Sequence, residues 1–318
     1  MQNLSQQPEQ ETAELEAHFP ALGTQNSIKV YGYRERIAAG TALKRAEERV
    51  RALHERLSVF QPESELSLLN ASAGCSPVAV SEDTYYLLDQ SKRYSRMSGG
   101  VFAITTRVLS ALWRIHARCG TVPSRTEIER ALSLVDDEDI ILDEQATTAA
   151  LRRTGQSVDL GSIAKGYAAD EVKRILLEGG VDGALINLGG TVCIIGKEKQ
   201  VGIQHPDRLT GISMGRISLS NACAVTSGDY ERYYEVEGTR YHHIVDPRTG
   251  YPARTNLRSV TLIGESALTL DALSTAVFVL GADEGLALVR KAGVEAVFVT
   301  DQLDVFCTDG LRGNFALL

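Results

Sequence analysis

The order of strand-like and helix-like segments restricts the fold of this chain more than any other feature of its sequence. Residues 27–33 alternate as a strand does, and residues 38–60 then repeat apolar side chains at helical spacing. Helical patterns continue over 81–97, 104–115, 124–135 and 269–293, with Ser81 and Ser124 as predicted N-caps. Strand patterns dominate from 183 to 264 and return at 294–308. Runs of strands with inserted helices predict an α+β fold, with mixed or antiparallel sheets and packed helices.

The chain has 318 residues, enough for one large or two ordinary domains. Residues 1–17 are polar and contain neither the apolar segment of a signal peptide nor a lipid-anchor cysteine. They are predicted to form a disordered N-terminal tail. No repeat, low-complexity tract or linker interrupts the remainder, so residues 18–318 are predicted to form a single domain or two intertwined α/β lobes.

The bulk composition excludes several classes of partner. The net charge is -8, without a basic stripe, so nucleic acid is not an expected partner. No run of 18 apolar residues predicts a transmembrane segment. The five cysteines form no CxxC pair, so neither a disulfide framework nor a zinc site is expected. The cysteines therefore favour a reducing compartment. The sequence as written predicts a cytoplasmic protein, or a periplasmic or membrane-anchored one if an export signal was trimmed.

Two glycine-rich turns are candidates for anion binding. In "DLGSIAKGYAAD" (159–170), Gly161 and Gly166 flank Lys165 in a predicted strand-turn-helix unit. Free N–H groups at the start of a helix suit a phosphate, but a plain tight turn fits equally well, since neither GxxxxGK[ST] nor GxGxxG is present. In "INLGG" (186–190), Gly189 and Gly190 allow a ligand to approach the backbone, or simply form a bulge.

Two strand ends carry polar groups. In "AVTSGDYERYY" (224–234), Thr226, Ser227 and Gly228 could hold a phosphate or a ribose, or form an ordinary hairpin turn. In "RYHHIVDPRTG" (240–250), the two adjacent histidines point to opposite faces of the predicted strand, so only one can face a site. Asp246 begins a predicted type I turn three residues after the second histidine. A histidine is usually structural, but one oriented by such a turn can act as a base.

The segment "DALST" (271–275) places Asp271 and Thr275 four residues apart, on one face of a predicted helix. A carboxylate and a hydroxyl at one point are hard oxygen ligands suited to Mg²⁺. A helix cap or a surface pair would give the same pattern, so the segment alone leaves both interpretations open.

Taken in order, these segments resemble the ApbE family of FAD:protein FMN transferases. The resemblance extends over about residues 19–310. The segments that carry it are "ALGT" (21–24), "SELSLLN" (64–70), "SGGVF" (98–102), "DLGSIAKGYAAD", "INLGG", "VTSGDYER", "HHIVDPRTG" and "DALST".

The resemblance implies an enzyme that cleaves FAD at its pyrophosphate with Mg²⁺, or Mn²⁺, transfers FMN to a Thr or Ser hydroxyl of an acceptor protein and releases AMP. It implies His243 as the base and a metal held by the Ala164 carbonyl, Asp271 and Thr275. Backbone N–H groups in the glycine turns suit the phosphates of FAD, and Tyr230 and Tyr233 are candidates for the wall of the flavin ring. The residues predicted to bind FAD are Gly161, Lys165, Gly166, Gly189, Gly190, Thr226, Ser227, Gly228, Tyr230 and Asp246.

Two positions depart from the family pattern. Ala103 stands where the family usually has the Asp of "GxFD", and Thr191 replaces a frequent Asp after "LGG". The loss at Ala103 leaves a non-catalytic FAD-binding protein as one alternative. An FAD pyrophosphatase that produces FMN and AMP is the other, because transfer and hydrolysis differ only in the nucleophile that reaches the phosphorus.

Overall fold

The computed structural model describes residues 14–114 and 121–318, and its core is an antiparallel sheet of eight strands. Every neighbouring pair in this sheet is antiparallel, which confirms the predicted α+β class. In sheet order, its strands are β1 (Leu15–Ala21), β2 (Thr24–Tyr33), β6 (Val181–Leu188), β7 (Thr191–Ile195), β10 (Cys223–Gly228), β13 (Leu257–Gly264), β14 (Glu295–Thr300) and β15 (Val305–Cys307).

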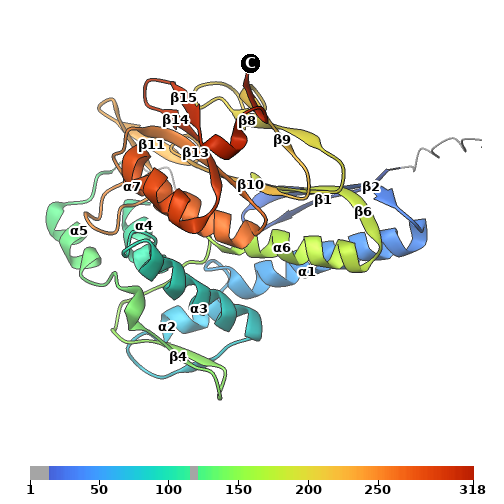
Figure 1. The fold of residues 1–318 in the computed structure, drawn as a ribbon. Coiled ribbons are helices and arrows are strands. Elements are labelled where there is room, and N and C mark those ends of the chain that lie inside the picture. The colour runs from blue at the N-terminus through green and yellow to red at the C-terminus, as the bar shows by residue number, and fades with distance from the viewer. Residues whose placement is uncertain (1–13, 115–120) are drawn as a thin grey trace, which may run out of the picture.

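Apolar side chains on both faces of this sheet are covered, which gives the molecule three layers. One face packs on α1 (Arg36–Leu57), α6 (Ala164–Glu178) and α7 (Ala267–Ala292), as Figure 1 shows. The other face buries Ile194, Ala224 and Val297 against a second sheet. That sheet contains β8 (Lys199–Gln204), β9 (Ser213–Leu219) and β16 (Phe315–Leu317).

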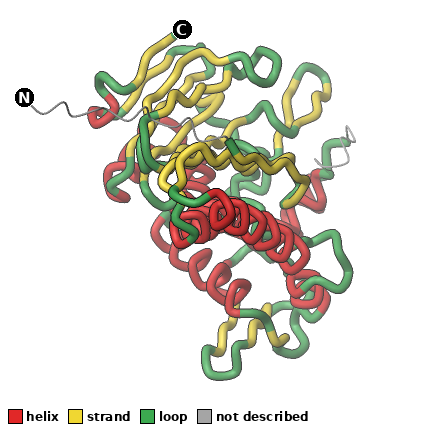
Figure 2. Tube along the Cα trace, turned by 90° about the vertical axis from the view of Figure 1, so that its right-hand side faces the viewer, coloured by secondary structure: helices red, strands yellow, loops and turns green. Residues whose placement is uncertain are grey.

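The remaining helices lie on the side of α1 and α7 that faces away from the large sheet (Figures 1 and 2). They are α2 (Glu65–Ala71), α3 (Glu82–Met97), α4 (Arg107–Trp113) and α5 (Arg125–Leu132), with short 3-10 turns at Ile104–Thr106, Asp137–Asp139 and Asp309–Leu311. The minor strands are β3 (Val78–Ala79), β4 (Ile140–Asp143), β5 (Thr148–Leu151), β11 (Tyr233–Val236) and β12 (Thr239–His242). Both predicted N-caps are confirmed: Ser81 accepts from the Thr84 N–H, and Ser124 forms a capping box with Glu127.

One predicted boundary and one predicted strand differ from the structure. The tail was expected to end at residue 17, but β1 already begins at Leu15, because Leu15 and Ala17 pack against the main core. Residues 1–13 lie outside the described part. The strand predicted at the start of the 157–181 unit does not form, since residues 157–160 pair with no strand in the described part. Instead, the side-chain amide of Asn70 donates to the Val158 carbonyl and accepts from its N–H.

The prediction about cysteines is also wrong. Cys193 on β7 and Cys223 on β10 are direct cross-strand neighbours, and they form a disulfide in the buried core. Their pairing depends on the sheet order, which spacing along the chain does not reveal. Of the other cysteines, Cys75 and Cys307 are free, and Cys119 lies outside the described residues. Disulfides persist mainly in oxidising compartments, so the cysteines no longer support a reducing one.

Helix α7 is long and apolar enough to cross a membrane by length and composition, the one such helix in the described part. In the fold it is a core helix, since 61% of its most apolar window is buried inside the protein. The helical pattern predicted over 269–293 is confirmed, with a kink inside it. The backbone of Gly281 is non-helical, with φ of 79°, and Asn256 accepts the N–H of Ala282 just beyond this kink.

The crossing of α6 and α7 is held by two carboxylates, one from each helix. Asp170 of α6 accepts the N–H groups of Ala267 and Leu268 and so caps α7. Asp271 of α7 accepts the N–H of Gly166, at 2.9 Å. The helices come so close that a Cβ on Gly166 would lie 2.3 Å from the Ala267 carbonyl oxygen. Gly166 is therefore required by packing, whatever else it does.

We expect Gly166→Ala to lower the free energy of unfolding by about 1–3 kcal/mol, because the added methyl group meets backbone atoms that cannot move independently. Gly40→Ala is the matched control. Gly40 also lies inside a helix, α1, but a Cβ there meets nothing within 4 Å, so we expect a gain of about 0.5–1 kcal/mol. Denaturant unfolding of both variants measures the difference. Equal effects at the two sites would contradict the close approach at Gly166.

Candidate active site

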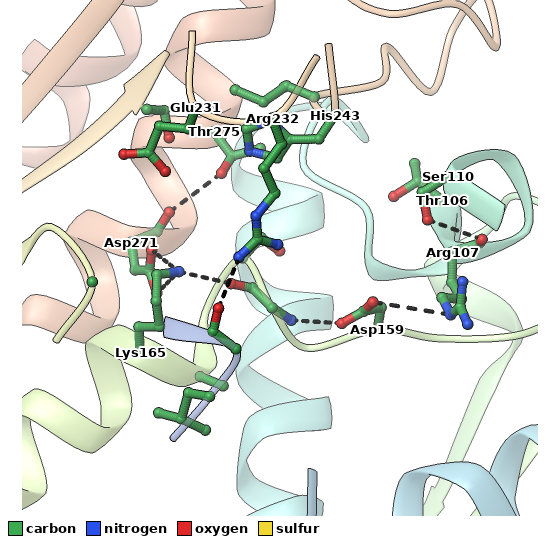
Figure 3. Close-up of a pocket in the computed structure, with 18 of the residues that line it drawn as sticks. Thr106, Arg107, Ser110, Asp159, Lys165, Glu231, Arg232, His243, Asp271 and Thr275 are labelled. Atoms are coloured by element: carbon green, nitrogen blue, oxygen red, sulfur yellow. Dashed lines mark hydrogen bonds and ion pairs between the residues drawn. The ribbon is translucent and has the colours of Figure 1, made fainter. Parts of the chain in front are cut away.

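A cavity of about 310 Å³ opens where the helical layer meets the ends of β6, β10 and the β1–β2 hairpin (Figure 3). Its walls come from eight separate parts of the chain, which explains why no single motif identified it. The lining residues fall within 22–24, 54–60, 101–110, 159–165, 226–232 and 243–245, together with Gly189 and, from α7, Asp271 and Thr275.

One side of the cavity contains the Asp271 carboxylate. Asp271 is only 4% exposed, and its oxygens receive the Gly166 N–H and the Lys165 ammonium, the latter at 3.3 and 3.4 Å. The same ammonium donates to the Gly161 carbonyl at 2.8 Å. Asp271 and Lys165 thus form an ion pair that faces the cavity, and Figure 3 shows both side chains on the same side.

The predicted metal ligands lie together on this side. Ala164, the first residue of α6, and Thr275, one turn beyond Asp271 on α7, both line the cavity with Asp271. A carboxylate, a hydroxyl and a backbone carbonyl are oxygen donors, the type that Mg²⁺ prefers. The described residues include no group of three or more His, Cys, Asp or Glu that could hold a metal, so a metal here would need neutral oxygens beside Asp271. The donor chemistry fits a magnesium ion.

His243 lines the cavity directly after β12. Its N–H donates to the Arg232 carbonyl, which fixes the backbone at the cavity wall. Its Nδ1 is buried and has no hydrogen-bond partner among the described residues. Burial, reinforced by His242 and by the positive charges of Arg232 and Lys165, lowers the pKa of the imidazole to about 3. His243 is therefore a neutral base at ordinary pH.

His242 points the other way, as the strand alternation predicted for this pair. Its Nε2 hydrogen-bonds with the Ala253 carbonyl at 2.8 Å, and its ring packs edge-on against Phe278 in the core. Burial also lowers the pKa of His242. The side chain does not line the cavity, so its role is structural.

The predicted glycine and hydroxyl positions surround the rest of the cavity. Gly189 is in the β6–β7 hairpin turn with φ of 58°, and a Cβ there would lie 2.4 Å from the Thr24 side chain. On β10, the Thr226 hydroxyl pairs with that of Thr261, and the Ser227 hydroxyl pairs with that of Ser274. Gly161 and Gly228 line the cavity as well.

Four predicted binding residues do not line the cavity. Gly166 supports the α6–α7 crossing, and Gly190 completes the hairpin turn with φ of 90°. Tyr230 packs against Gly228, and burial raises the pKa of its hydroxyl. Asp246 accepts from the N–H and the guanidinium of Arg248 and so stabilises its own turn. Each of these residues supports a neighbouring segment of the wall.

Several lining residues had not been singled out from the sequence. Arg107 lies 3.9 Å from Asp159 and above the ring of Phe60, on the side of the cavity opposite Lys165 in Figure 3. Arg232 extends to the Gly23 carbonyl in the β1–β2 turn. The sequence contained a signal for two of them, since the quoted motifs "ALGT" and "VTSGDYER" include Gly23 and Arg232. Arg107 and Phe60 lie outside the quoted motifs.

A buried carboxylate positions the Arg107 side of the cavity. Asp137 accepts the N–H groups of Ile104 and Thr105 and the Thr105 hydroxyl. These bonds hold the turn that begins at Ala103, the position where the family usually has Asp. Burial raises the pKa of Asp137 to about 6 in spite of its three donors. Ala103 itself lines the cavity, so a larger polar group there would face the ligand space.

Fold and cavity together define an α+β protein with a composite cavity that brings together oxygen donors, cations and a neutral histidine. A family model described as the ApbE family matches residues 22–298, and the chain belongs to this family. It is 35% identical over 298 residues to a protein named FAD:protein FMN transferase from Klebsiella pneumoniae (strain 342), covering 93% of this chain and 92% of the relative. A relative of the same name from Treponema pallidum (strain Nichols) is 33% identical over 316 residues, covering 93% and 87%.

Solved structures agree with this membership. The crystal structure of the ApbE protein from Thermotoga maritima MSB8 aligns with a TM-score of 0.86 at 32% identity, covering 95% of this chain and 99% of that one. The apo form of the flavinyl transferase ApbE from Pseudomonas stutzeri aligns with a TM-score of 0.84 at 26% identity, covering 97% and 98%. The similarity therefore extends over essentially the whole described fold.

The lowered pKa of His243 predicts a particular loss of stability in acid. The unfolded chain protonates this imidazole below about pH 6.5, whereas the folded protein does so only near pH 3. Its contribution to the free energy of unfolding therefore falls as pH drops from 6.5 to 3, by at most about 1.4 kcal/mol per pH unit. We expect the free energy of unfolding, measured at pH 7, 6, 5 and 4, to decline less steeply with falling pH for His243→Gln than for wild type. If the free energies of unfolding of wild type and variant fall in parallel with pH, the pKa of His243 is not lowered by folding.

Proposed function

We propose that this protein transfers FMN from FAD to a Thr or Ser hydroxyl of an acceptor protein and releases AMP, with Mg²⁺ as its metal. The observation that carries the proposal is the meeting, in one cavity, of a half-buried, neutral histidine with Asp271, Thr275 and Ala164, which offer a carboxylate, a hydroxyl and a carbonyl oxygen. The names of the relatives from Klebsiella and Treponema support the same reaction.

The acceptor hydroxyl has to lose its proton as its oxygen attacks the phosphorus next to the riboflavin. His243 is the base available for this step, because its imidazole is neutral and faces the cavity. Burial is the main cause of the low basicity of His243, and the charges of Arg232 and Lys165 lower its pKa further. A pyrophosphate in the cavity opposes those charges and raises the imidazole pKa, so the base gains strength when the substrate is in place.

The substrate's negative charge is met by cations on both sides of the cavity. Lys165 lies on one side, Arg107 on the other, and Arg232 crosses the opening near the β1–β2 turn. Positively charged donors of this kind hold phosphate oxygens and the charge that develops on them. This local cluster explains how a protein with a net charge of -8 can bind a dianion.

Asp271, Thr275 and the Ala164 carbonyl would hold the magnesium ion. When bound, the ion supplies Lewis-acid polarisation of the phosphate oxygens and neutralises negative charge as the P–O bond breaks. Asp271 would provide the one negative charge of this set. Gly166 orients that carboxylate by donating its N–H to one oxygen.

We expect His243→Ala to slow acceptor modification by about 10²–10⁴-fold, the range usual for loss of a general base. The assay incubates the protein with FAD, Mg²⁺ and an acceptor carrying an exposed Thr, then detects the FMN adduct by mass spectrometry and AMP by chromatography. His18→Ala, at the exposed side chain on β1, is the control and should keep wild-type rates.

The same assay separates the alternatives. FMN and AMP released in equal amounts without an adduct would identify an FAD pyrophosphatase. FAD binding without any product would identify a binding protein. A His243→Ala variant that modifies the acceptor at the wild-type rate would remove His243 from the chemistry.

We expect Asp271→Asn to reduce Mg²⁺-dependent AMP release by at least about 10³-fold, since the metal loses its only negatively charged ligand. The amide keeps the size of the side chain and an oxygen that can accept the Gly166 N–H. Calorimetric titration with Mg²⁺ should show loss of metal binding, while circular dichroism should show the fold retained. Wild-type metal affinity in this variant would mean that the metal binds elsewhere.

A further inference from the structure

Lys165 occupies the space next to Asp271 that a cation would need. Its ammonium lies 3.3 Å from one carboxylate oxygen, 3.4 Å from the other and 2.8 Å from the Gly161 carbonyl. It therefore lies among oxygens of the 159–165 turn and of α7, the two segments that provide the proposed metal ligands. A small hard cation prefers this same kind of oxygen environment.

The ion pair is well shielded on the carboxylate side and open on the lysine side. The side chain of Asp271 is 6% exposed, whereas that of Lys165 is 23% exposed and faces the cavity. A nearly buried carboxylate requires a positive partner, because an unpaired charge in such a place is strongly destabilising. The lysine, in contrast, is carried on a flexible four-carbon stem and can leave towards the cavity.

From this geometry we infer that Lys165 is an exchangeable counter-ion, which a divalent cation has to displace from Asp271 in order to bind. The inference rests on the proposed function only in the assignment of Asp271 as a metal ligand. It makes Lys165 a positioning residue that keeps Asp271 ordered and the α6–α7 crossing neutral until the metal takes its place.

The displacement has a thermodynamic consequence. Metal binding has to break the Lys165–Asp271 pair, so the lysine lowers the affinity of the protein for the metal. Removing its charge should raise that affinity. Coupling between two ligands that compete for one group typically amounts to five- to 150-fold, and we expect about tenfold here.

The test is calorimetric titration with Mg²⁺ of the full-length protein, without FAD. We expect Lys165→Met to bind Mg²⁺ about tenfold more tightly than wild type, and Lys165→Arg, which keeps the charge, to bind no more tightly than wild type. Lys173→Met is the matched control. Lys173 is on the same helix and is also paired with an aspartate, Asp170 at 3.6 Å, but it does not line the cavity. It should leave the affinity unchanged.

Thermal unfolding provides a second measurement that does not depend on turnover. Lys165→Met leaves Asp271 without its cation, so its Tm should be lower than that of wild type and should rise more on addition of Mg²⁺. If Lys165→Met folds only in the presence of Mg²⁺, this also supports the inference, because the metal then replaces the missing ammonium beside Asp271. Metal affinity and Mg²⁺-induced Tm shift both equal to or smaller than those of wild type would overturn the inference.

The two proposals fail in different ways. If wild type binds Mg²⁺ and modifies an acceptor while Lys165→Met shows no gain in affinity, the exchange is wrong and the proposed reaction stands. If wild type and Lys165→Met bind no Mg²⁺ at all, the metal assignment and the exchange are both wrong.

Discussion

The site depends on the close crossing of α6 and α7, where each helix receives hydrogen bonds from the other at a carboxylate. Asp170 caps the start of α7, and Asp271 accepts from the N–H of Gly166 near the start of α6. The positive ends of both helices thus lie beside a negative charge, which is the favourable arrangement. Glycine is the only residue type that permits so close an approach of α7 at position 166, because a Cβ there would meet the Ala267 carbonyl oxygen. The crossing brings Ala164, Lys165, Asp271 and Thr275 to one side of the cavity, although 106 residues separate Lys165 from Asp271.

A small aromatic core attaches the histidine to the opposite side of the cavity. Trp113 at the end of α4 stacks on Tyr241 of β12, and its indole N–H donates to the Gly250 carbonyl. The same helix begins with Arg107, and the strand is followed directly by His243. Arg107 and His243 are thus placed by one cluster, as Lys165 and Asp271 are placed by one helix crossing. The cavity lies between these two packed units, which are joined by the contact of Arg107 with Asp159 at 3.9 Å and by His242 against Phe278 of α7.

Much of this architecture was predictable from periodicity, because amphipathic helices such as 81–97 and the strands between 183 and 264 have strong local patterns. The exceptions have physical causes. Val158 pairs with a side chain, Asn70, that imitates a strand neighbour. Cys193 and Cys223 meet only through the sheet order. Within the site, sequence patterns found residues such as Asp271 and His243. They did not find Arg107, whose helix α4 packs on β12 through Trp113, or Phe60, which lies in the turn after α1.

The electrostatics of the cavity connect substrate binding to the chemistry. Lys165 and Arg232 are suited to a pyrophosphate, and the same two charges help to keep the pKa of His243 near 3. A dianion that neutralises them therefore acts on the base as well as on its own affinity. In the exchange that we propose, Lys165 leaves Asp271 for the metal, and its charge also acts on the His243 imidazole. In the proposed function, a bound pyrophosphate opposes these two charges and so favours the protonated form of the imidazole, which raises its pKa.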